Sequence, residues 1–177
     1  MSKIWKAYLR LLEKHPAKTQ IIQTGILMST GDIISQVGVE KRPVKEIDWK
    51  RNGKFSAFGF FLAGPAVRAW YNALDKIIGP LAKRAALKKM AADQLFFAPS
   101  FLTIFVSYMA LTQGGGKQEI IQKLKKEYLQ ILTTNYKIWP AVQMVNFYFV
   151  PLQLRILVVQ VISLFWNTYL AFVSNKE

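Results

Sequence analysis

Residues 138–173 read IWPAVQMVNFYFVPLQLRILVVQVISLFWNTYLAFV, and this run contains one charged residue, Arg155. About 20 apolar residues in a helix cross the hydrocarbon core of a bilayer, so the run is long enough for a membrane span. Between Phe149 and Ile156 the sequence offers no loop that would reverse the chain. It therefore predicts one long tilted helix, kinked near Pro151.

Three other segments have the same character, at residues 19–39, 55–78 and 90–113, and basic stretches separate them. Inside a membrane the backbone must satisfy its own hydrogen bonds, which favours helices. We therefore expect an all-α integral membrane bundle of four transmembrane helices in a single domain, residues 1–177. A soluble helical bundle is the alternative, but its helices would be apolar along one stripe rather than all round.

The composition excludes several classes of function. The chain has 177 residues, 52% of them hydrophobic, and a net charge of +14 from 24 basic and 10 acidic residues. The bases are divided among several loops, which favours anionic membrane lipid as a partner and argues against direct nucleic-acid binding. The chain has no cysteine and one histidine, so it offers no thiol or histidine cluster for a metal. We expect no catalytic, cofactor-binding or metal site, and therefore no enzyme.

Two further segments carry apolar residues at helical spacing with lysines on the opposite side. The first is residues 1–14, and the second lies between Ile121 and Ile131, ahead of the last span. Helices of this kind lie in the interface between membrane and water. We expect both segments to be interfacial helices.

Small residues and prolines within the spans predict local packing. Gly25 and Ser29 are four residues apart, as are Gly31 and Ser35, a spacing that lets membrane helices approach closely. Pro99 removes a backbone donor within the third span, so we expect it to interrupt that helix.

Polar side chains within the spans are the candidates for function. An unpaired charge at mid-membrane costs roughly 2.5–3.5 kcal/mol, so these side chains need partners or water. In one interpretation they line a pore for small solutes or ions, and in the other they hold the helices together. The candidate pore or interhelical residues are Asp32, Gln36, Arg68, Asp93, Gln94, Gln143, Asn146, Arg155, Gln160 and Asn167.

Several short motifs occur in the order found in one known family. They are Gly31-Asp32-Ile33-Ile34-Ser35-Gln36, Gly64-Pro65, Trp70-Tyr71, Asp93-Gln94, Ala98-Pro99 and Trp139-Pro140-Ala141-Val142-Gln143. The chain from Trp5 to Leu170 thereby resembles the Mpv17/PMP22 family of small organelle-membrane proteins. The motif in the fourth span is highly specific.

This resemblance implies four transmembrane helices, a location in the mitochondrial inner membrane and a channel-like activity that affects membrane potential. The peroxisomal membrane is the alternative location. The resemblance also implies a part in maintaining mitochondrial DNA through nucleotide supply. The alternative function is a non-conducting scaffold or assembly protein that acts indirectly on mitochondrial homeostasis. A homo-oligomer is compatible with either function.

Overall fold

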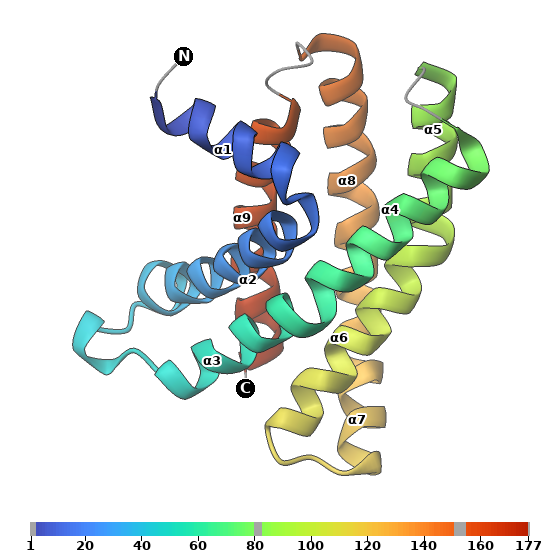
Figure 1. The fold of residues 1–177 in the computed structure, drawn as a ribbon. Helices are drawn as coiled ribbons and strands as arrows, with labels where there is room; N and C mark the ends of the chain where they lie inside the picture. Colours follow the sequence, from blue (N-terminus) through green and yellow to red (C-terminus); the bar gives the residue numbers. More distant parts are fainter. Residues whose placement is uncertain (1–2, 80–82, 151–154, 177) are drawn as a thin grey trace.

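The computed structural model describes residues 3–79, 83–150 and 155–176, and all regular elements in these ranges are helices (Figure 1). The expected all-α class is therefore confirmed. The α-helices are α1 (Lys3–Lys14), α2 (Pro16–Ile34), α3 (Trp49–Phe58), α4 (Gly64–Ile78), α5 (Lys83–Ala92), α6 (Ala98–Thr112), α7 (Lys117–Lys123), α8 (Leu129–Phe149) and α9 (Arg155–Asn175).

Three pairs of helices are joined end to end by five-residue π-helical turns. The turns are Gly59–Ala63 between α3 and α4, Asp93–Phe97 between α5 and α6, and Leu124–Tyr128 between α7 and α8. Pro65 and Pro99 closely follow the first two of these turns, where the wider turn accommodates a residue that cannot donate a backbone hydrogen bond. Pro99, just beyond the second of these turns, widens its helix without breaking it, so the predicted interruption is wrong.

The amphipathic segment ahead of the last span is also not a separate interfacial helix. Residues 117–149 form one continuous helix through α7, the π turn and α8. By length and composition, one helical stretch within the described residues, Ala85–Thr112, qualifies as a membrane span. The four-span bundle stays a prediction.

The segment 138–173 folds back on itself, so the predicted single helix is wrong. Figure 1 shows α8 and α9 running in opposite directions, and the Thr134 and Tyr169 hydroxyl oxygens lie 3.0 Å apart. In one continuous helix these positions would be about 52 Å apart. The cause is local: Val150, which precedes a proline, has an extended backbone with φ −93° and ψ 126° and ends α8. Pro151 itself lies outside the described residues.

Glycines set the close packing of α2 against its neighbours. A Cβ placed on Gly59 would lie 2.7 Å from the Cα of Gly25, and one on Gly31 would lie 2.6 Å from the Cβ of Asn167. Helix α2 therefore packs both on the π turn after α3 and on α9, as its small residues predicted. The core beside these contacts includes the fully buried side chains Phe55, Phe58, Phe105, Met109 and Ile131.

Candidate functional site

A cavity of about 800 Å³ lies between the helices, and α1, α2, α3, α4, α5, α6, α8 and α9 all contribute to its wall. Most of the polar candidates predicted from the sequence meet there. The candidates that line it are Arg68, Asp93, Gln94, Gln143, Asn146, Gln160 and Asn167.

The wall formed by α4, α5 and the following π turn carries the charged side chains. Trp70 Nε1 donates a hydrogen bond to Asp93 Oδ1 over 3.1 Å, and Gln94 Nε2 donates to Asp93 Oδ2 over 3.1 Å. Asn135, on α8, donates in turn to Gln94 Oε1 over 2.7 Å. Within the described part of the chain Asp93 therefore has neutral partners and forms no ion pair.

The other charges of the cavity have separate partners. Arg68 donates to Gln20 Oε1 over 2.9 Å, and Lys89 of α5 forms an ion pair with Asp75 of α4. Within the described residues Arg68 therefore forms no ion pair with an aspartate. Arg155 begins α9, and its side chain lies outside the described part of the chain.

The described lining residues of α8 and α9 are neutral and rich in carboxamides. Gln160 Nε2 donates to the Tyr8 hydroxyl over 2.5 Å, and that hydroxyl donates to Gln23 Oε1 over 2.8 Å. Asn146 is 3% exposed, and its Oδ1 has no hydrogen-bond partner among the described residues. A buried acceptor without a partner is costly unless water or a bound solute supplies a donor.

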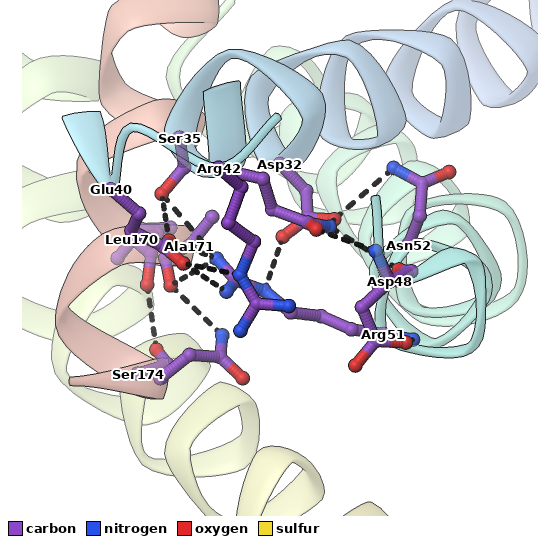
Figure 2. A network of polar contacts seen from close by, with 12 residues as sticks. Asp32, Ser35, Glu40, Arg42, Asp48, Arg51, Asn52, Leu170, Ala171 and Ser174 are labelled. Atoms are coloured by element: carbon purple, nitrogen blue, oxygen red, sulfur yellow. Dashed lines mark hydrogen bonds and ion pairs between the residues drawn. The ribbon is translucent and has the colours of Figure 1, made fainter. Parts of the chain in front are cut away.

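Asp32 and Gln36 do not line the cavity but belong to a buried ionic network (Figure 2). Arg51 Nε donates to Asp32 Oδ1 over 2.7 Å, and its two terminal nitrogens donate to the Glu40 carboxylate over 2.7 and 2.8 Å. Arg51 Nη2 also donates to the Ala171 carbonyl of α9 over 3.2 Å. The network therefore ties α2, α3 and α9 together.

Neutral side chains complete the bonding of the buried Asp32 carboxylate. Gln36 Nε2 and Asn52 Nδ2 donate to Asp32 Oδ2 over 2.8 and 3.2 Å. Gln36 Oε1 also accepts from the Asp48 backbone N–H over 2.7 Å. With its oxygens bonded and its side chain fully buried, Asp32 has a structural role in this conformation.

Arg51 is the residue that sequence reasoning missed, because it lies in a basic stretch and looked like a loop charge facing lipid. It is 6% exposed. The usable signal was Asp48, whose Oδ1 accepts from the Arg51 backbone N–H over 2.9 Å and caps α3. That cap starts the helix at Trp49 and places Arg51 in its first turn, one residue before the buried Asn52.

Acid should weaken the network through Glu40. Burial acts to raise the pKa of Glu40, but hydrogen bonds from Arg51 and Ser35 and the attraction of Arg51 and Arg42 outweigh it and hold the pKa below its ordinary value of 4.5. The ionised Glu40 stabilises the fold at any pH above the pKa that it has in the unfolded chain. This stabilisation is lost as the pH falls through its pKa in the folded protein. We expect the melting temperature in detergent to decrease when the pH is lowered below about 4.5. In Glu40→Gln this decrease should be smaller. An identical acid response in Glu40→Gln would contradict this assignment.

The sequence pattern of the Mpv17 / PMP22 family matches residues 110–171, from the end of α6 to α9. A Xenopus laevis protein described as mitochondrial inner membrane protein Mpv17 is 46% identical over 177 residues, which cover 100% of both chains. The human protein of the same description is 43% identical over 173 residues, 98% of each chain. PXMP2/4 family protein 2 of Dictyostelium discoideum is 37% identical over 179 residues, 98% of this chain and 92% of that protein. No solved structure matches the chain.

The extent of these matches settles the affiliation that the short motifs suggested. These two relatives are more than 40% identical to the chain and cover 98% or more of it. The chain belongs to the Mpv17/PMP22 family and is a protein of the mitochondrial inner membrane.

Proposed function

We propose that the cavity passes small polar solutes or ions across the mitochondrial inner membrane. The observation that carries this proposal is the meeting of seven polar candidates around one cavity of about 800 Å³. Small-molecule sites span roughly 300–1,000 Å³, so the cavity is large enough for a metabolite-sized solute. Packing alone does not require a cavity of this size, because protein interiors are close-packed.

The physiological consequences that we propose follow from the family resemblance. Passage of ions or small solutes through this cavity would influence the membrane potential and support mitochondrial DNA maintenance through nucleotide supply. We also propose that the basic loops contact anionic lipid head groups, which favour lysine and arginine at a membrane surface. The predicted interfacial position of α1 belongs to the same proposal.

The deciding experiment is conductance of the purified full chain in planar bilayers of anionic lipid. We expect discrete current steps that require the protein. A solute-efflux assay in proteoliposomes covers the case of a slow, non-ionic substrate. Absence of both currents and efflux from a correctly folded sample would exclude passage.

The second candidate function is a non-conducting scaffold, and the buried network favours it. Two of the polar candidates, Asp32 and Gln36, are bonded within the protein and hold helices together. A scaffold would leave conductance at the background of empty membranes while its loss disturbs mitochondrial homeostasis. The bilayer experiment therefore separates the two functions.

If the cavity conducts, Asp93→Asn should lower the preference for cations over anions. The substitution removes a fixed negative charge from a wall of low dielectric, where the Coulomb interaction with an ion exceeds that in water. Among the described side chains Trp70 and Gln94, and no arginine, bond this carboxylate, so the melting temperature should change little. Ion selectivity and stability are measured on the same preparation, the first as the reversal potential in a salt gradient and the second as the melting temperature in detergent.

The matched control is Glu13→Gln, which removes an exposed acid on α1 that is not part of the cavity wall. It should leave both quantities unchanged. Unaltered selectivity in Asp93→Asn together with a large fall in melting temperature would assign this carboxylate to packing rather than to the solute path.

A further inference from the structure

The cavity ends within the bundle at the same level on several helices. On α6 the last residue lining it is Leu102; one turn further Phe105 and Val106 are fully buried, and two turns further so is Met109. On α8 it ends at Asn135, with Ile131 fully buried one turn beyond. The cavity therefore has a floor.

Aromatic rings form the centre of this floor. The Phe58 ring lies 5.6 Å from Phe101, 5.3 Å from Phe105 and 5.0 Å from Tyr108, measured between centroids. Phe58 and Phe101 also line the cavity, whereas Phe105 does not. Phe58 ends α3 and the other three rings come from α6, so the layer joins two helices.

The layer is thin. From Leu102, which lines the cavity, to the buried Met109 the chain rises about 10 Å along α6, against a hydrocarbon core roughly 30 Å thick. At the edge of this layer the Tyr108 hydroxyl donates to the carbonyl of Lys54, one helical turn before Phe58 on α3, over 3.0 Å. A thin apolar layer thus bounds the polar cavity at this level.

Separating the rings of the floor costs less free energy than separating the buried ionic network beside it. Parting aromatic rings breaks dispersion contacts that form again when the rings return. Parting α2 from α3 would leave Asp32 or Arg51 buried without a partner, which is a much larger cost. Apolar constrictions also gate channels by excluding water when closed. The ring layer is therefore the part of the floor that can open.

We propose that Phe58, Phe101 and Phe105 form the gate of the cavity, closed in this structure, and that solute crosses only when these rings separate. This inference rests on the proposed function, because a gate has meaning only if something passes. It assigns to three apolar residues the role of permeation barrier, and to the polar residues the role of holding the solute above it.

Thiol accessibility tests the position of the barrier without any transport assay. The chain contains no cysteine, so each introduced thiol is the single reactive site. A charged methanethiosulfonate reagent should modify Ser163→Cys in the cavity wall roughly tenfold or more faster than Val106→Cys, which is fully buried within the ring layer. Equal rates at the two positions would overturn the gate.

Removing one ring should open the barrier. Phe105→Ala, added to Val106→Cys, should raise the modification rate of that cysteine and increase solute efflux. The matched control is Phe96→Ala on the same helical stretch, whose side chain is 65% exposed and does not line the cavity. The assignment would be contradicted if Phe96→Ala raised the modification rate and the efflux as much as Phe105→Ala does. It would also be contradicted if neither variant raised them.

A locked variant keeps the test valid if Phe105→Ala fails to fold. In Phe58→Cys/Phe101→Cys a short bifunctional thiosulfonate should join the two positions and suppress efflux, and a reductant should restore it. Efflux that persists through the cross-linked protein would refute the gate. Efflux tests the proposed function, and the thiol rates test the barrier. If the thiol rates differ as expected but no folded sample passes any solute, the proposed function is wrong and the position of the barrier is still supported.

Discussion

Replacing Arg51 by methionine should lower the free energy of unfolding by about 3–5 kcal/mol, the largest effect that we expect from a single substitution. Arg51 bonds two carboxylates and the Ala171 carbonyl, and the Asp32 side chain is fully buried. Without the guanidinium, Asp32 must either stay charged in a dry environment or take up a proton. Thermal or denaturant unfolding in detergent, followed by circular dichroism, measures the loss.

A neighbouring arginine provides the control. Arg42 lies 3.6 Å from the same Glu40 carboxylate, but its side chain is 43% exposed. An exposed pair contributes about 0–1 kcal/mol, so Arg42→Met should unfold almost as the native chain does. Adding Asp32→Asn to Arg51→Met should recover part of the loss, because the second substitution removes the unpaired buried charge. Equal effects of Arg42→Met and Arg51→Met would show that the network contributes nothing specific.

The sequence predicted the helical class and the polar composition of the cavity because both depend on which residue types recur along the chain. Gln160, Ser163 and Asn167 fall on one side of a helix from spacing alone, and all three line the cavity. The glycines of the first span likewise predicted close helix contacts, since only a small residue permits them.

What the sequence did not predict depends on pairing between distant elements. Asp32 was expected either to line a pore or to hold helices together. Its partner Arg51 was not identified, because periodicity cannot distinguish Arg51 from the other bases of its stretch. The reversal between α8 and α9 was missed because no glycine or polar loop marks it. The restriction that proline imposes on the preceding Val150 was the available signal.

Gly59→Ala should destabilise the protein by about 1–3 kcal/mol through overpacking, although alanine favours a helix more than glycine does. The added methyl group would lie 2.7 Å from the Gly25 Cα and 3.1 Å from the Gly25 backbone nitrogen and the Thr24 carbonyl oxygen. These are backbone atoms, so no side-chain rotation relieves the contact, and the π turn after α3 must move away from α2.

Gly53→Ala tests the same chemical change where space is free. Gly53 lies on α3, six residues before Gly59, and an added Cβ there meets nothing within 4 Å. This variant should raise the free energy of unfolding by up to about 1 kcal/mol, from helix propensity alone. The two alanine variants therefore should shift the melting temperature in opposite directions. A shift of the same sign and size in both would mean that the contact between Gly25 and Gly59 does not determine how α2 packs.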